Sequence, residues 1–339
     1  MRLPDPEIID PNSVPSLRWG VIGPGGIAEV FVGASKKFTS QQFHAVASRT
    51  AGRAEEFAKK LEIPRTHNNY QALVEDDQLD AIYIASWHHE HFEHAMLALN
   101  AGKHVLVEKP ITIDPGHAEQ IFALANQKGL LAMEAMWTRY LPHSTIVRKL
   151  ISEGDLGAPE FFSASFCVDN RHIPRLWQKG GGSIIYDMGI YPIAMAQEFM
   201  GNPIKITAIG SVTENKLDRE SFSVFEYASG AKAQVTASGI ATIPTSASCS
   251  FEKATLVIEE PFFVPTGLSL RDKELYFTET NWHDQTPIQG HDGLSYQATW
   301  FAKYVSEGRA ESEVHNAIDT IANIRVAAEI AKQLGAEPI

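Results

Sequence analysis

The sequence contains very little cysteine and lacks any long apolar run. Its 339 residues include two cysteines, Cys167 and Cys249, which lie far apart. So few thiols argue against a disulfide framework or a cysteine-ligated metal, and they fit a reducing compartment. No apolar stretch approaches the roughly 18 residues that a membrane-spanning helix needs. We therefore expect a cytoplasmic protein that does not enter a membrane.

Basic side chains are scarce relative to acidic ones. The chain carries 29 Lys and Arg against 41 Asp and Glu, which gives a formal net charge of −12. A surface that binds nucleic acid or an anionic membrane needs concentrated positive charge, so this balance argues against both partners. A local basic pocket for a phosphate group remains compatible with it.

The length and the order of the apolar segments predict two domains. A single hydrophobic core rarely serves a chain of this size. Residues 17–136 alternate short apolar strands with helical patterns, which is typical of an α/β fold with a doubly wound parallel sheet. Residues 137–339 contain longer alternating segments and predict an α+β domain with an antiparallel sheet and few helices. We expect residues 1–16 to form a leader, and whether the C-terminal helix packs back on the first domain stays open.

A glycine-rich turn, GPGGIA at 23–28, follows the first predicted strand and opens the first predicted helix. Gly23 permits the tight turn, Gly25 lets a pyrophosphate approach the backbone, and Ala28 allows close packing of helix on sheet. The start of the helix offers free N–H groups to the phosphates. In this context the motif predicts dinucleotide binding, and the alternative is a glycine turn without a ligand.

The end of the second predicted strand distinguishes the two nicotinamide cofactors. An Asp or Glu there usually holds the ribose hydroxyls of NAD, whereas an arginine accommodates the 2′-phosphate of NADP. This chain has Ser48 and Arg49 at that point and no acidic residue. We therefore predict NADP, with NAD as the alternative. A solvated arginine at a helix start is the simpler explanation of Arg49.

Three stretches together resemble the glucose–fructose oxidoreductase / inositol dehydrogenase (Gfo/Idh/MocA) family. They are GPGGIA at 23–28, ALNAGKHVLVEKP at 98–110 and GGGSIIYDMGIYP at 180–192. The stretch MEAMWTRYLP at 133–142 is most similar to the dihydrodiol and D-xylose dehydrogenase branch. The resemblance implies a Rossmann domain and a C-terminal domain with a large open, mostly antiparallel sheet. It further implies a homodimer or dimer of dimers formed through that sheet, and hydride transfer between NADP and a carbinol carbon of a sugar or related polyol.

The resemblance also assigns three catalytic residues, Lys109, Asp187 and Tyr191. A free phenol titrates near pH 10, so a tyrosine base at neutral pH needs a neighbouring positive charge, which Lys109 would supply. Asp187 lies four residues before Tyr191 and would share its helical face. An alternative makes Lys109 the base. The simpler explanations are that Lys109 only ends a strand, that Asp187 holds a backbone turn and that Tyr191 is a packed ring.

Other residues are assigned from their places at the ends of predicted strands and in the loop before the glycine-rich helix. The cofactor set is Gly23, Gly25, Gly26, Ile27, Ala28, Ser48, Arg49, Ala85, Ser86, His88, His91, Glu108 and Lys109. The candidate substrate contacts are Trp137, Arg139, Arg171 and Trp177. For Trp137 and Arg139, packing without substrate contact is an equally good explanation.

Four histidines in HHEHFEH at 88–94 raise the possibility of a zinc hydrolase. The zinc signature HExxH is not met, because position 93 is glutamate. Helical spacing predicts that Phe92, Ala95, Met96 and Leu99 are buried and that His94 faces water. We therefore predict no metal, with His88 and His91 beside the nicotinamide and with His89 and His94 solvated. A third hypothesis is a non-catalytic NADP sensor of the same fold, which steady turnover of NADP would exclude.

Overall fold

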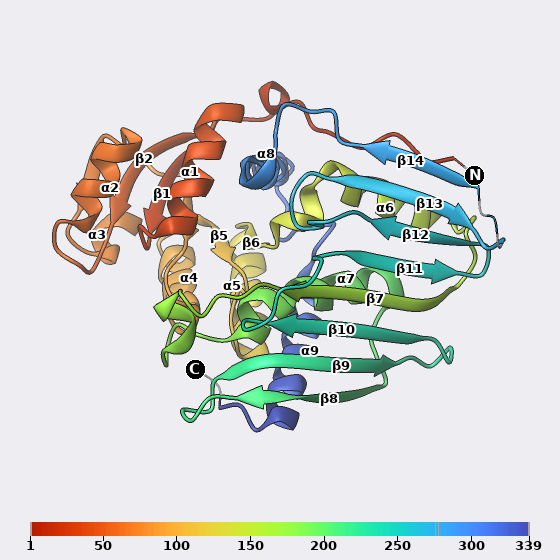
Figure 1. Cartoon of the computed structure of the whole chain (residues 1–339). Coiled ribbons are helices and arrows are strands. Elements are labelled where there is room, and N and C mark those ends of the chain that lie inside the picture. Colours follow the sequence, from red (N-terminus) through yellow and green to blue (C-terminus); the bar gives the residue numbers. More distant parts are fainter. Residues whose placement is uncertain (1, 275, 277, 338–339) are drawn as a thin grey trace. The chain divides into compact units, whose positions relative to one another are not determined.

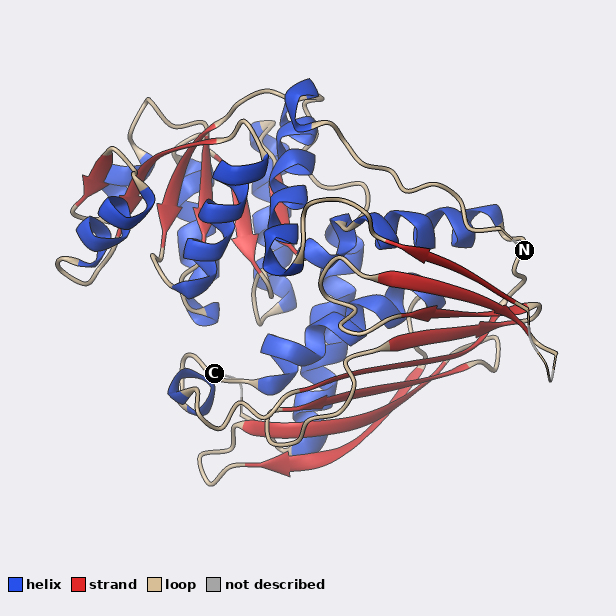
Figure 2. Cartoon of the chain, turned by 45° about the horizontal axis from the view of Figure 1, so that its top comes forward, coloured by secondary structure: helices blue, strands red, loops and turns tan. Residues whose placement is uncertain are grey.

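The computed structural model describes residues 2–274, 276 and 278–337, which divide into two compact units (Figures 1 and 2). The first comprises Ile9–Tyr140 and Ile288–Ile321, and we call it the Rossmann unit. The second comprises Met1–Ile8, Leu141–Pro287 and Ala322–Ile339, and we call it the sheet unit.

Parallel strands form the sheet of the Rossmann unit, and within the described residues there are six of them, in the order β3-β2-β1-β4-β5-β6. They are β1 (Arg18–Ile22), β2 (Gln42–Ala47), β3 (Arg65–His67), β4 (Ala81–Ile84), β5 (His104–Glu108) and β6 (Ala132–Ala135). Strands β4 and β6 are buried along their whole length, as expected where helices cover both faces of a sheet. Because β2 and β4 flank β1, the strand order reverses beside β1, and ligands bind at this point in such folds.

Helices lie on both faces of this sheet (Figure 2). They are α1 (Gly26–Phe38), α2 (Arg53–Leu61), α3 (Tyr70–Val74), α4 (His91–Asn100), α5 (Pro115–Lys128) and α8 (Leu294–Ser306), and α9 (Ala317–Leu334) begins in this unit. At the start of α5 the Asp114 side chain accepts a hydrogen bond from the amide of His117 at 3.0 Å. This contact caps the helix, and Pro115 in the first turn is pre-organised for the helical backbone.

The sheet unit is built on a larger, mostly antiparallel sheet, as predicted. Its eight strands among the described residues lie in the order β14-β13-β12-β11-β7-β10-β9-β8, and every pair is antiparallel except β7 with β10. They are β7 (Pro159–Cys167), β8 (Lys205–Val212), β9 (Asp218–Glu226), β10 (Lys232–Ser238), β11 (Ala247–Phe251), β12 (Ala254–Ile258), β13 (Gly267–Asp272) and β14 (Glu279–His283).

Helices α6 (Pro142–Glu153) and α7 (Ile190–Met200) belong to the same unit, and α7 packs on β7. Figure 2 shows that, among the described residues, the helices of this unit lie on one face of its sheet. The strands alternate accordingly: in β9 Phe225 is buried, whereas its neighbour Val224 is 45% exposed. Ile209 of β8 lies directly opposite Phe222 of β9, and both are on the uncovered face. The sheet therefore presents an apolar strip on the side that no helix covers.

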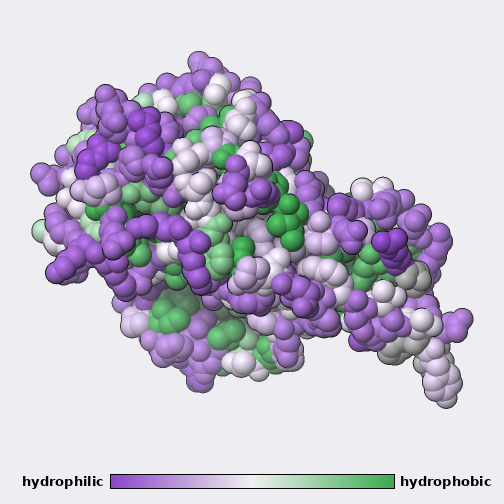
Figure 3. Space-filling model, turned by 90° about the horizontal axis from the view of Figure 1, so that it is seen from above, coloured by the Kyte–Doolittle hydropathy of each residue, from purple (hydrophilic) through white to green (hydrophobic). Residues whose placement is uncertain are grey.

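No helix of the described residues has the length and apolar character needed to cross a bilayer. Most of the face in Figure 3 is hydrophilic, and hydrophobic side chains occur there in small groups.

Cys167 and Cys249 are buried and free, and burial raises the pKa of their thiols to about 11 and about 12. Both therefore stay protonated, which makes them poor nucleophiles and poor metal ligands.

We expect His143 in α6 to make the stability of the protein pH-dependent. Its side chain is 1% exposed, and burial lowers its pKa from 6.5 to about 3, against the opposing effect of its hydrogen bond to the Phe262 backbone. Below pH 6.5 the unfolded chain binds a proton at this histidine and the folded chain does not. The contribution of this group to the free energy of unfolding is therefore fully present above pH 6.5 and is lost as the pH falls toward 3. Between pH 6.5 and pH 5 the free energy of unfolding should fall by about 2 kcal/mol from this group.

Urea unfolding of the wild type and of His143→Gln at pH 7 and pH 5 measures this effect. The glutamine should remove most of the fall in the free energy of unfolding that this histidine causes. His172→Gln, at an exposed position of the same unit, serves as the control and should leave the fall unchanged. Equal losses in His143→Gln and the wild type would show that another group causes the acid sensitivity.

Candidate active site

The glycine turn between β1 and α1 leaves room for a phosphate group. Gly23 has φ +83°, and a Cβ there would lie 2.6 Å from the carbonyl carbon of Ala85, so only glycine fits. Gly25 is the N-cap of α1, and a Cβ built on Gly26 would meet nothing within 4 Å. The open space above this turn, at the start of a 13-residue helix, fits the pyrophosphate of a dinucleotide.

A cleft opens beside this turn, at the carboxyl ends of β1, β2 and β4. It is lined by Gly23, Pro24, Gly25, Ser48, Arg49, Thr50, Arg53, Tyr70, Ala85, Ser86, Trp87 and Glu90. Six residues of the predicted cofactor set lie in this lining: Gly23, Gly25, Ser48, Arg49, Ala85 and Ser86. Gly26, Ile27, Ala28, His88, His91, Glu108 and Lys109 are not among the lining residues. Ala28 is fully buried, in keeping with its predicted role in packing α1 on the sheet.

An acidic residue whose role is not visible in the sequence also reaches this cleft. Glu90, after β4, forms an ion pair with Arg49, after β2. Its other carboxylate oxygen accepts a hydrogen bond from the amide of Trp87 at 3.3 Å. The side chain of Glu90 is 8% exposed, whereas that of Arg49 is 64% exposed. Strand β2 carries no acid at its end, but the segment that follows β4, on the other side of β1, brings Glu90 to Arg49 there.

His91 is fully buried at the start of α4 and connects two loops. Its Nδ1 lies 2.9 Å from the carbonyl oxygen of Pro110, and its Nε2 lies 3.0 Å from the carbonyl oxygen of Ser86. Burial lowers the pKa of its imidazole. The ring therefore lies between the loop after β4 and the loop after β5, and in its neutral form it donates a hydrogen bond to one of them.

His94 is buried, and the prediction that it faces water was wrong. Helix α3 packs against α4 and covers that face, so the edge of the Tyr70 ring meets His94 at a centroid distance of 4.6 Å. Nδ1 of His94 lies 2.8 Å from Oγ of Ser86. Burial lowers the pKa of His94 to about 4, so it is neutral at neutral pH. The apolar stripe is also less deep than predicted, because Phe92 and Met96 are partly exposed.

The other two histidines of the string differ in burial. His88 is buried beside His91, with ring centroids 5.7 Å apart, and His89 is exposed, as predicted. Among the described residues no group of three or more His, Cys, Asp or Glu side chains could hold a metal ion. The zinc hydrolase hypothesis therefore finds no ligand set in this part of the chain.

Lys109 directly follows β5, at the carboxyl edge of the parallel sheet. The preceding residue, Glu108, is buried and accepts a hydrogen bond of 2.5 Å from the hydroxyl of Tyr83 on β4. The peptide bond between Lys109 and Pro110 is cis. Strand pairing and the Glu108 contact thus fix the point from which the lysine side chain leaves the sheet.

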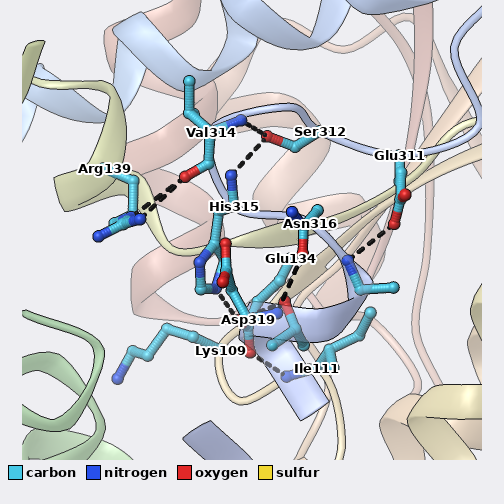
Figure 4. A network of polar contacts seen from close by, with 12 residues as sticks. Lys109, Ile111, Glu134, Arg139, Glu311, Ser312, Val314, His315, Asn316 and Asp319 are labelled. Atoms are coloured by element: carbon cyan, nitrogen blue, oxygen red, sulfur yellow. Dashed lines mark hydrogen bonds and ion pairs between the residues drawn. The ribbon is translucent and has the colours of Figure 1, made fainter. Parts of the chain in front are cut away.

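The backbone of Ile111, two residues after Lys109, is held by the carboxylate of Glu134 on β6. Glu134 accepts a hydrogen bond of 2.7 Å from the amide of Ile111, and its other oxygen lies 2.6 Å from Nε2 of His315. Thr320 donates to that same oxygen at 3.4 Å. Glu134 and His315 are each 1% exposed. Figure 4 shows this network, with the Lys109 side chain extending away from Glu134.

The two predicted substrate contacts of the Rossmann unit are buried within it. Trp137 is 2% exposed and stacks on His291 with ring centroids 5.8 Å apart. The guanidinium of Arg139 donates two hydrogen bonds, of 3.0 and 3.3 Å, to the carbonyl oxygen of Val314 (Figure 4). Both side chains therefore have packing and backbone contacts inside this unit.

Asp187 and Tyr191 lie in the sheet unit, where the chain changes from one helix type to another. Residues Ile185–Gly189 form a π-helical turn that leads into α7, whereas a single regular helix was predicted. Buried Asp218 accepts hydrogen bonds from the hydroxyl of Ser183 at 2.7 Å and from the amide of Ile185 at 2.6 Å. These contacts fix the start of the turn. Such insertions into helices occur frequently at functional sites.

The remaining predicted site residues, Arg171 and Trp177, also lie in the sheet unit. Arg175 lies 3.6 Å from the carboxylate of Asp187, and the ring of Tyr191 lies 5.6 Å from that of Phe166. Arg171 is exposed and binds the side chain of Asp169, with Nε 2.9 Å from a carboxylate oxygen. Trp177 donates from Nε1 to the carbonyl oxygen of Asn170 at 2.9 Å.

The fold and the cleft together define the class of protein: a dinucleotide-binding Rossmann unit joined to a unit with a large mixed sheet. Residues 17–136 match the model of an oxidoreductase family with an NAD-binding Rossmann fold, and residues 145–257 match the C-terminal domain model of the same family. The chain belongs to the Gfo/Idh/MocA family, as its sequence predicted. It is an oxidoreductase of the type that acts on CH–OH groups with a nicotinamide cofactor.

Relatives and solved structures extend over most of the chain. The trans-1,2-dihydrobenzene-1,2-diol dehydrogenase of Mus musculus is 31% identical over 88% of this chain and 91% of its own. The human enzyme of that name is 29% identical over 94% and 97%. A 3-ketoreductase from Actinomadura kijaniata, solved with NADP and TDP-benzene, has a TM-score of 0.81 and 26% identity over 96% and 99%. A levoglucosan dehydrogenase solved with NADH and levoglucosan shares the fold, with a TM-score of 0.83 and 19% identity over 95% and 98%.

Proposed function

We propose that this protein is an NADP-dependent dehydrogenase or reductase of a sugar or a related cyclic diol or polyol, such as D-xylose or a trans-dihydrodiol. The observation that carries the proposal is the cleft in which the glycine turn, Ser48 and Arg49 meet at the switch point of the parallel sheet. The mouse and human relatives are named as dehydrogenases of a cyclic diol, which supports the substrate class.

The residues of the cleft fit NADP. The glycine turn and the first amides of α1 would hold the pyrophosphate. Ser48 and Arg49 would bind the 2′-phosphate, and Arg53 in the same lining adds a second positive charge. A related 3-ketoreductase was solved with NADP, in agreement with this assignment. NAD is the alternative, because Glu90 lies in the same cleft.

The proposed chemistry is proton transfer coupled to hydride transfer. When bound, the nicotinamide accepts or donates the hydride. The chain must then remove the hydroxyl proton of the alcohol or return it to the carbonyl. We assign this step to Lys109 and Tyr191, with the lysine ammonium stabilising the phenolate or acting itself as the acid and base. Asp187 would orient the lysine or a hydroxyl group of the substrate.

A substrate screen tests the proposal. Purified protein would be incubated with NADP or NAD and with pentoses, hexoses, anhydro- and keto-sugars, inositols and aromatic dihydrodiols, and absorbance at 340 nm would be followed. We expect turnover with at least one compound and a higher kcat/KM with NADP than with NAD. Binding of NADP without turnover of any compound would favour the sensor hypothesis. Activity that depends on a metal and is lost on chelation, without use of either cofactor, would favour the hydrolase.

We further propose that two copies associate through the uncovered face of the large sheet. Ile209, Phe222, Val224 and Phe161 lie on that face and are each at least 45% exposed. A row of apolar side chains on a β-sheet surface is typical of an interface between subunits. Sedimentation velocity measures the oligomeric state.

A cytoplasmic location also fits the two free thiols.

A further inference from the structure

A buried negative charge lies in the dinucleotide cleft, next to the arginine that we assign to the 2′-phosphate. Glu90 is held there by the ion pair with Arg49 and by the hydrogen bond from the amide of Trp87. Both charged residues line the same cleft as Ser48. The carboxylate therefore has a fixed position rather than a flexible one on the surface.

The chain topology explains why this charge reaches the ribose subsite. Strands β2 and β4 are both neighbours of β1, so the segments that follow them lie on either side of the glycine turn. In this fold the end of the second strand contacts the adenosine ribose. Glu90 meets Arg49 at that end and thus supplies the acid that β2 lacks.

The local structure does not require the charge. Glu90 ends the short helix η2 (His88–Glu90), where its carboxylate caps the amide of Trp87. A glutamine could make the same contact, because its amide oxygen also accepts a hydrogen bond. A buried charge costs free energy unless a partner neutralises it, and here the partner is the arginine of the phosphate subsite. The charge therefore acts on the subsite rather than on the fold.

We propose that Glu90 is a specificity-determining residue that limits the preference of this enzyme for NADP over NAD. Its negative charge repels the 2′-phosphate, and its ion pair with Arg49 competes with the binding of that phosphate to Arg49. NAD carries a neutral hydroxyl at this position and experiences neither effect. The inference rests on the NADP site proposed above and names the residue that opposes it.

Binding of two small probes tests the inference in the purified full-length protein. Adenosine 2′,5′-bisphosphate carries the 2′-phosphate, and 5′-AMP does not. Calorimetry on Glu90→Gln should show about tenfold tighter binding of the bisphosphate, the effect of one removed charge near a partly solvated phosphate. Binding of 5′-AMP should change less than about twofold, and the ratio of kcat/KM for NADP to that for NAD should rise about tenfold.

Two further variants separate the possible outcomes. Glu93→Gln removes an equal charge from an exposed position of α4 outside the cleft lining, and it should change neither affinity. Arg49→Gln should weaken the bisphosphate at least about tenfold and spare 5′-AMP. If Arg49→Gln weakens the bisphosphate while Glu90→Gln leaves it unchanged or weaker, the inference is overturned and the NADP site stands. If Arg49→Gln has no effect, the proposed NADP site fails, and the inference fails with it.

Discussion

Replacement of Lys109 by alanine is expected to lower kcat about a thousandfold, while NADP still binds. The lysine lies at the carboxyl end of β5, where open parallel sheets place their ligands. Without its ammonium group a tyrosine base would keep a pKa near 10, and a lysine base would be missing altogether. Loss of a positioned acid or base typically costs a factor of about 100 to 10,000 in rate.

Steady-state kinetics measures the expected loss of kcat, and a cofactor fluorescence titration measures the retained binding of NADP. Lys128→Ala, at an exposed position near the end of α5, removes a lysine of the same unit and should leave kcat unchanged. Normal turnover in Lys109→Ala would remove the lysine from the mechanism. Tyr191→Phe then decides which group transfers the proton. A Tyr191→Phe variant with an unaltered pH–rate profile would assign that role to Lys109.

The parts of the site that depend on local backbone geometry could be predicted from sequence. The turn at 23–28 is an example, because a positive φ at Gly23 and the missing space for a Cβ require glycine at a fixed spacing. The caps and the alternation of strands and helices are local in the same sense. For this reason the parallel sheet, the larger antiparallel sheet and the phosphate-binding turn all agree with the sequence.

The parts that depend on contacts between distant segments could not be predicted. The helical period of α4 places His94 away from the apolar stripe, and only the packing of α3 with Tyr70 shows that it is buried. Glu90 is not recognisable as a ribose-subsite acid, because it follows β4 and reaches Arg49 only through the strand order. The π-helical turn before α7 likewise depends on Asp218, which lies 33 residues after Ile185.

Glu134 is the clearest case of this kind, and its replacement carries the second large expected effect. Its position on a short buried strand gives no hint of partners at Ile111 and His315, of which the second is 181 residues away. Glu134→Ala would leave a buried imidazole and a buried amide without their shared acceptor. The free energy of unfolding should fall by about 3 kcal/mol, as for other buried pairs that lose one partner.

Glu134 should also affect catalysis, because it holds the amide of Ile111 two residues after Lys109. Glu134→Gln can still accept that hydrogen bond, so it should keep more stability and more activity than Glu134→Ala. In both variants kcat should fall more than the affinity for NADP, since the dinucleotide cleft does not include Glu134. Glu55→Ala, at an exposed position of α2, is the control for loss of a carboxylate.

Urea unfolding and steady-state kinetics on the same preparations separate the two roles of Glu134. If the alanine variant loses stability but retains the wild-type kcat below its unfolding transition, Glu134 supports only the fold. If kcat decreases from the wild type to Glu134→Gln and again to Glu134→Ala while the affinity for NADP stays constant, Glu134 is a positioning residue for Lys109. The second result is expected, because the same carboxylate that stabilises the buried network also fixes the backbone from which the lysine extends.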